Sequence, residues 1–244
     1  MKRLIKLLFL SLFFIGWDMP DSYKAPGRKS FTSTSNNNHF KYIPSNTFAL
    51  TSFHLGKMMN KMGYDQIMRT ELMNYMFNEM REEGIPRKIR NFIKDPNLLG
   101  FDLNQPIYSF VSADFLDVRF SKNLVAGSVI PIQDYDLFDL NVASLIDLIP
   151  DRDVDIIQGK FNDEFNYALF RVDSYRKEDL DIFILCYNEE NLILLLNVDV
   201  DGNGQDINLR SLMKRYIFDD NQFNKPGINE IDKADISFWS DVSI

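Results

Sequence analysis

Segments in which hydrophobic and polar residues alternate every two positions are interspersed along the chain with segments of helical period. Residues Thr47–Phe53 alternate in this way and predict a strand. Two apolar runs, 181–187 and 192–198, are joined by four polar residues and predict a β-hairpin. Strand character also marks residues 107–113, 118–120, 124–132, 155–161, 167–172 and 234–242.

Residues 65–83 predict an amphipathic helix that ends at Gly84, with Pro86 beyond it. Its apolar residues recur at spacings of three and four, which is typical of a stripe facing a core. The alternative is an adaptable binding groove, because methionine side chains accommodate many partners. The stripe consists of Ile67, Met68, Leu72, Met73, Met76, Phe77 and Met80. Further helices are predicted at residues 54–62, 86–94, 134–148 and 207–217.

The predicted strands and helices do not alternate strictly. That order predicts an α+β fold, with a mostly antiparallel sheet and amphipathic helices packed on it. The strand at 234–242 is loosely similar to the strand at 47–53, since both carry an aromatic residue late in a short run. The similarity predicts a chain truncated at its C-terminal end, where a second similar unit would begin.

The first 17 residues have the pattern of an export signal. Lys2, Arg3 and Lys6 precede the apolar run LLFLSLFFIG at 7–16, and a basic start before such a run is typical of secretory signals. The run is shorter than the ~20 apolar residues that a membrane-spanning helix needs. A buried N-terminal helix is the alternative, although core helices seldom lack polar positions on every face.

The residue that follows the apolar run bears on how the signal is processed. A bacterial lipoprotein has a lipid-bearing cysteine there, whereas this chain has Trp17. The large residues around that position also make a poor site for ordinary signal cleavage. We therefore expect either a diverged lipoprotein that has lost its anchor or a protein that keeps its signal.

Residues 18–40 are rich in Ser, Thr, Asn, Gly and Pro. They predict a flexible tether, because they offer little apolar surface to bury. His39 lies in this tether, and its position there gives little support to a role as a ligand. The predicted folded domain spans residues 41–244. Charge divides at the same point, since residues 1–40 carry net +4 and residues 41–244 carry net −12.

Composition narrows the classes of function. The chain has 244 residues, of which 45% are hydrophobic, and a formal net charge of −8. The negative charge argues against a nucleic-acid binder, which needs a basic surface. We interpret the basic segment 86–94 as a solvated face that balances nearby acids. The only cysteine, Cys186, excludes a disulfide within the chain and a multi-cysteine metal site.

A set of short structural motifs spans residues 42–239. They are YIPSN at 42–46, DP at 95–96, GFDL at 100–103, PIY at 106–108, PIQD at 131–134, CYN at 186–188, LIL at 192–194 and ADISFW at 234–239. Together they resemble motifs of a widespread family of uncharacterised exported proteins and lipoproteins of Bacteroidota. Members of that family are typically twice as long and carry a lipidated cysteine, and this chain departs on both counts. The resemblance implies export and an α+β fold, and it implies no reaction.

The strongest metal candidate is the segment DVDGNGQD at 199–206. Asp199, Asp201 and Asn203 place oxygen ligands at positions 1, 3 and 5 of a calcium loop, and the glycine at position 6 also fits. The second half does not match, because Arg210 stands where the loop has its bidentate carboxylate. A solvated turn that needs no ion is the alternative. No other cofactor is predicted.

Candidate catalytic groups have no diagnostic spacing. Two facing carboxyls are what an acid–base hydrolase needs, and aspartates are plentiful. Cys186 and His54 form a second pair on paper, although a cysteine in an apolar strand is usually buried and unreactive. The chain has no G-x-S-x-G elbow, phosphate loop or G-x-G-x-x-G fingerprint. The aspartates are Asp134, Asp136, Asp139, Asp147, Asp151, Asp153 and Asp155.

These patterns predict an exported protein of the periplasm, outer membrane or cell surface that acts as a non-catalytic binding or structural module. Its partner would be an unknown envelope or surface component, with no nucleic acid involved and with membrane contact only through the leader. The alternatives are an exported hydrolase that uses carboxylates and an adhesion-like module stabilised by calcium. Two facing acids in a concave pocket would favour the hydrolase.

Overall fold

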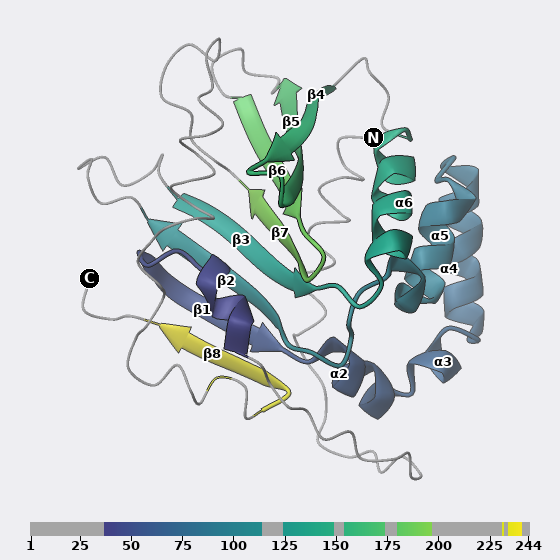
Figure 1. The fold of residues 1–244 in the computed structure, drawn as a ribbon. Coiled ribbons are helices and arrows are strands. Elements are labelled where there is room, and N and C mark those ends of the chain that lie inside the picture. The colour runs from purple at the N-terminus through teal and green to yellow at the C-terminus, as the bar shows by residue number, and fades with distance from the viewer. Residues whose placement is uncertain are drawn as a thin grey trace.

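An eight-stranded antiparallel sheet forms the centre of the structure (Figure 1). The computed structural model describes residues 37–113, 124–148, 154–173, 180–196, 231 and 234–240. The order across the sheet is β4-β5-β6-β7-β3-β2-β1-β8. Neighbouring strands pair antiparallel throughout this order. The predicted α+β fold with an antiparallel sheet is therefore confirmed.

The strand bounds agree with the sequence pattern to within two residues at either end. The strands are β1 (Thr47–Phe53), β2 (Ile107–Ala113), β3 (Leu124–Pro131), β4 (Val154–Phe161), β5 (Phe165–Asp173), β6 (Leu180–Tyr187), β7 (Asn191–Leu196) and β8 (Ile236–Ser240). The predicted hairpin is β6–β7, and the side chain of Asn188 holds its turn. Its Oδ1 accepts the backbone N–H groups of Glu190 and Asn191 at 3.0 and 2.8 Å. The strand predicted at 118–120 lies outside the described residues.

The helical segments are α2 (Leu55–Met62), α3 (Tyr64–Ile67), α4 (Glu71–Glu82), α5 (Arg87–Lys94) and α6 (Tyr135–Ile146), with the 3-10 helices η1 (Asn37–Tyr42) and η2 (Pro96–Leu99). The prediction of one helix over residues 65–83 is wrong, because the chain forms α3 and α4 instead. The Thr70 hydroxyl donates to the Ile67 carbonyl at 2.7 Å and accepts the Met73 N–H at 3.3 Å. Thr70 therefore caps a new helix. The helix predicted at 207–217 lies outside the described residues.

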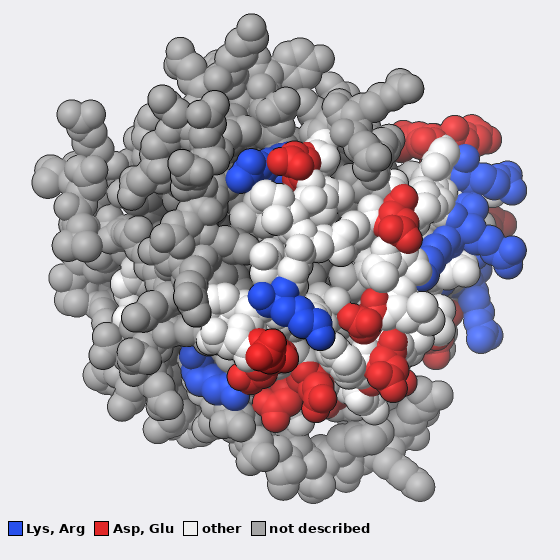
Figure 2. Space-filling model, turned by 45° about the horizontal axis from the view of Figure 1, so that its top comes forward, with Lys and Arg blue, Asp and Glu red and all other residues white. Residues whose placement is uncertain are grey.

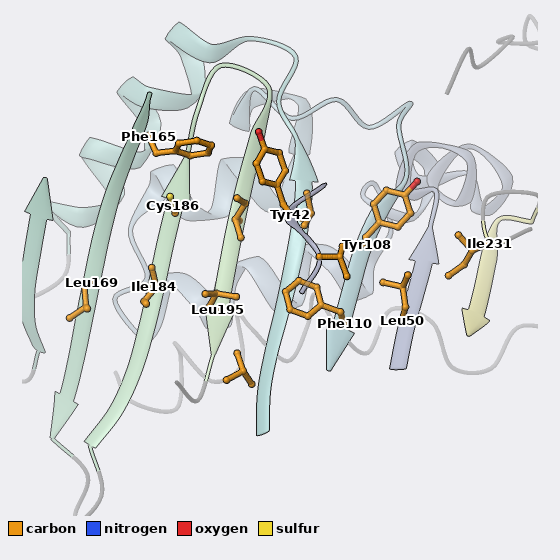
Figure 3. Close-up of a cluster of buried hydrophobic side chains, with 14 residues drawn as sticks. Tyr42, Leu50, Tyr108, Phe110, Phe165, Leu169, Ile184, Cys186, Leu195 and Ile231 are labelled. Carbon is orange, nitrogen blue, oxygen red and sulfur yellow. The ribbon is translucent and has the colours of Figure 1, made fainter. Parts of the chain in front are cut away.

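One face of the sheet packs against η1 (Figure 3). Phe40 of η1 lies 4.8 Å from Tyr108 between ring centroids, and Tyr42 packs edge-on against Phe165. The last residues of the segment predicted to be a tether thus belong to the fold. The buried cluster on this face is Tyr42, Ile43, Leu50, Tyr108, Phe110, Val125, Val129, Phe165, Leu169, Ile184, Cys186, Ile193, Leu195 and Ile231.

A cross-strand pair shows how closely this face is packed. Phe110 on β2 lies opposite Gly127 on β3. A Cβ atom at Gly127 would lie 2.3 Å from the Phe110 ring. Only glycine leaves room for the ring to lie over the neighbouring strand.

Helix α6 covers part of the opposite face. Phe138, Val142 and Ile146 project from α6 into a second cluster with strand residues such as Ile130 and Leu192. The Asp134 side chain caps the helix by accepting the Leu137 N–H at 3.0 Å. In the described part of the chain, no helix is both long and apolar enough to cross a bilayer.

Candidate binding surface

The four helices between β1 and η2 form a unit that we call the helical arm, residues 55–94 (Figure 1). Gly63 and Gly84, with φ angles of 64° and 77°, occupy the left-handed conformation at two of its joints. Seven of the ten methionines of the chain lie in these 40 residues. The arm carries eight basic and five acidic residues, whereas the rest of residues 41–244 carries 13 basic and 28 acidic. It is therefore the net-positive part of a negatively charged domain.

Few side chains of the arm's helices are buried. Helices α2 and α3 bury none, α4 buries Met73 and Phe77, and α5 buries Phe92. These three belong to neither of the two core clusters of the sheet. All three lie on α4 and α5, which contact each other.

Only some side chains of the predicted apolar stripe are buried, and others are exposed to solvent. A core-facing interpretation is right for Met73 and Phe77 and wrong for three other members. Leu72 is 68% exposed, Met76 41% and Ile67 37%. Tyr75, which the stripe did not include, is 62% exposed. Helix α4 therefore presents a row of large apolar side chains to solvent, with methionine among them.

Both ends of the arm are fixed to the domain. At the start, the Gly56 N–H donates to the Leu103 carbonyl at 2.9 Å, and Lys61 pairs with Asp235. A Cβ at Gly56 would lie 2.4 Å from that carbonyl oxygen, so only glycine allows the two backbone segments to lie this close together. At the far end, the amide of Asn141 on α6 donates to the Leu98 carbonyl of η2 at 2.7 Å. The exposed row on α4 is therefore carried between two anchored ends.

Charge is segregated between the two long helices of the arm. Helix α5 has four basic residues and no acidic one: Arg87, Lys88, Arg90 and Lys94. Helix α4 and its cap have Glu71, Glu79, Glu82 and Glu83 against Arg81 alone. Figure 2 shows basic side chains gathered over the side of the molecule where α4 and α5 lie in Figure 1.

The charged side chains of α4 and α5 are not paired with one another. The salt bridges found within the described ranges join Lys41 to Glu190, Lys61 to Asp235 and Arg171 to Asp155, and none involves α4 or α5. Lys94 and Lys88 instead lie over aromatic rings, at 4.6 Å from Phe77 and 5.8 Å from Phe92. The Nε atom of Arg90 is buried without a hydrogen-bond acceptor in the structure. The charges of α4 and α5 are therefore not neutralised by salt bridges within the described structure.

A second polar cluster lies between α6 and the strands. The Tyr187 hydroxyl donates to Asp139 Oδ1 at 2.6 Å, and the Asn166 amide donates to the Tyr135 hydroxyl at 2.8 Å. Burial, together with the hydrogen bond to Asp139, raises the pKa of Tyr187 far above its ordinary value. Burial also raises the pKa of Tyr135. Both phenols stay neutral at physiological pH, so the cluster ties the helix to the sheet.

Three of the five described candidate aspartates have local structural contacts. Asp134 caps α6, Asp139 accepts the Tyr187 hydrogen bond, and Asp155 pairs with Arg171 at 3.5 Å. Asp136 and Asp147 are exposed on or beside α6. Asp151 and Asp153 lie outside the described residues. No contact in the structure joins two of the described aspartates as an acid–base pair.

The candidate thiol–imidazole pair is separated by the sheet. Cys186 lies on β6, and His54 follows β1, with β7, β3 and β2 between these strands. At a strand spacing of about 4.8 Å, the two strands are roughly 19 Å apart. Cys186 is completely buried, and burial raises its pKa strongly. The Cys186–His54 hypothesis is therefore wrong.

His39 has a structural contact that the sequence did not indicate. Its Nδ1 lies 2.5 Å from Oδ1 of Asn191, a fully buried residue at the start of β7. The neighbouring Asn188 amide donates to the Tyr42 hydroxyl at 3.1 Å. These contacts hold η1 over the sheet.

The calcium-loop residues Asp199, Asp201 and Asn203 lie outside the described residues, so the calcium prediction stays a prediction. Within the ranges that are described, no three His, Cys, Asp or Glu side chains are grouped to hold a metal ion. Comparisons of the chain with family models, with curated proteins and with solved structures find no match.

Proposed function

We propose that the protein is an exported, non-catalytic binding module of the cell envelope and that the helical arm is its contact surface. The observation that carries this proposal is the exposed apolar row on α4, which stands beside unpaired charges on an arm anchored at both ends. An isolated exposed apolar residue needs no explanation, but a row of them next to unpaired charge is typical of a contact surface.

The chemistry of the arm fits a surface that adapts to its partner. Methionine is unbranched and polarisable, and seven methionines lie among the arm's helices. Tyr75 adds a large amphipathic side chain of the kind that interfaces favour. The sheet supplies the rigid support, because both of its faces carry buried clusters.

A crosslinking experiment tests the contact surface. A photo-reactive phenylalanine analogue replaces Met76 on α4, or Ile157 on β4 as the control, in cells that express the full chain. The two positions are matched, since they are 41% and 37% exposed. We expect a discrete crosslinked product from position 76 and none from position 157. Absence of a product at 76, or equal products at both positions, would overturn the assignment of the surface.

Export is tested separately. Protease added to intact cells, to cells with a permeable outer membrane and to lysed cells reports the compartment of the full chain. We expect digestion before lysis, because the leader has a basic start and an apolar run. Digestion only after lysis would place the protein in the cytoplasm and overturn the envelope assignment.

A further inference from the structure

We propose that the partner that binds the helical arm is a second copy of this chain, so that the protein forms a dimer through α4 and α5. This inference rests on the proposed function in one respect only: both use the helical arm as the contact surface. Leu72, Tyr75 and Met76, the exposed apolar residues of α4, would form the centre of the dimer interface. Water would be excluded from them as the two copies meet, which favours association.

Charge complementarity points to a second copy. Helix α4 with its cap is acidic, whereas the adjoining α5 is wholly basic. A two-fold axis that runs along this pair of helices places each α4 beside the α5 of the other copy, in an isologous contact. Because α4 and α5 are joined by a short turn, Glu82 and Glu79 of one copy would then stand level with basic residues near the start of α5 in the other.

The overall charge distribution supports the same arrangement. Outside the arm, residues 41–244 carry 13 basic and 28 acidic side chains, so two copies repel one another over most of their surfaces. The arm instead presents an acidic helix beside a basic one, so opposite charges of two copies can face each other there.

The first test measures the mass of the purified full chain by light scattering and sedimentation across a range of concentrations. We expect a concentration-dependent dimer. The variant Leu72→Lys/Met76→Lys should dissociate at a concentration about tenfold higher or more, because charges enter the centre of the contact. The control variant Ile157→Lys on β4 should behave as the wild type. Circular dichroism of each variant establishes that the fold is kept.

The second test uses charge reversal. Arg87→Glu/Arg90→Glu leaves α5 without a net positive charge and places two acids at its start, whereas Glu79→Lys/Glu82→Lys gives α4 with its cap a net positive charge like that of α5. Each variant alone should be monomeric, whereas an equimolar mixture should form a heterodimer that weakens at high salt. A wild-type chain that stays monomeric, a dimer that survives all these variants, or a mixture that stays monomeric would overturn the proposal. A monomer that still gives crosslinks at position 76 in cells would leave the proposed function in place, with another protein as the occupant.

Discussion

The sheet and the helical arm use hydrophobic residues in different ways. In the sheet, the central strands alternate between two faces that both carry buried clusters, and residues such as Leu50, Val125 and Leu195 are completely buried. In the arm, four helices bury only Met73, Phe77 and Phe92. Both regions have regular apolar patterns in the sequence. A periodic pattern therefore shows that an element is amphipathic, but it does not show how much of its apolar side is covered.

The two regions also differ in whether their polar side chains are paired. Near the sheet, several polar side chains are paired with one another, as in the contacts of Tyr187 with Asp139 and of His39 with Asn191. On α4 and α5, opposite charges lie on adjoining helices without forming ion pairs. Paired polar groups stabilise the domain, whereas unpaired ones are free to select a partner.

The two regions should differ most in the free energy of unfolding that is lost when a leucine is replaced by alanine. Leu195→Ala, at a fully buried position on β7, should lower the free energy of unfolding by about 2–5 kcal/mol. Leu72→Ala, at an exposed position on α4, should change it by about 0.5 kcal/mol or less. Urea denaturation at a concentration where the protein is monomeric measures both values. Equal losses of stability in the two variants would show that Leu72 is buried like Leu195, and the contrast between arm and sheet would be wrong.

Adding a single methyl group should be costly in the sheet. Gly127→Ala places a Cβ at 2.3 Å from the Phe110 ring, and we expect a loss of about 1–3 kcal/mol. Gly84→Ala is the control in the arm, where no atom lies within 4 Å of the added Cβ and only the positive φ opposes it. Combining Gly127→Ala with Phe110→Leu should cost less than the sum of the two single changes. Additive losses would contradict the proposed clash.

Removing a helix cap should have a local effect in the arm and a global effect beside the sheet. Thr70→Ala and Asp134→Ala each remove a side chain that accepts a helix N–H, at a cost of about 1 kcal/mol. For Thr70→Ala we expect faster amide hydrogen exchange in α4 and little change in global unfolding. For Asp134→Ala we expect the loss to appear in global unfolding, because α6 contributes to a core cluster. The reverse result would mean that the arm unfolds together with the sheet.

The smallest expected effect is a dependence on alkaline pH, which should be strongest on the sheet side. The pKa of Tyr187 is raised in the folded state, so its contribution to stability is complete below its ordinary pKa near 10 and is lost as the pH rises above that value. Between pH 8 and pH 10 the stability difference between wild type and Tyr187→Phe should narrow by about 0.4 kcal/mol. Tyr75 on α4 serves as the comparison: a hydrogen bond to Glu79 also raises its pKa, but solvent screens that contact, so Tyr75→Phe should show a smaller change over the same range. Urea denaturation at both pH values measures these differences.

Several features of the fold are decided locally, and the sequence predicts them well. Strand bounds follow from alternation, and helix ends follow from residues such as Asp134, Gly63 and Gly84. The break between α3 and α4 had a local signal as well, since threonine is a favoured N-cap, but the long apolar periodicity across it concealed the break. The concentration of methionines in residues 55–94 and the wholly basic α5 were visible signals of the candidate surface.

Other features depend on which elements meet, and no short segment contains that information. The sequence alone determined that this chain forms antiparallel strands and amphipathic helices, because side-chain period and capping act over a few residues. Only the tertiary structure decided that Cys186 and His54 lie on distant strands, that His39 belongs to the fold, and that α4 leaves Leu72 and Tyr75 in solvent. Burial is a property of two surfaces in contact, and a sequence pattern describes only one of them.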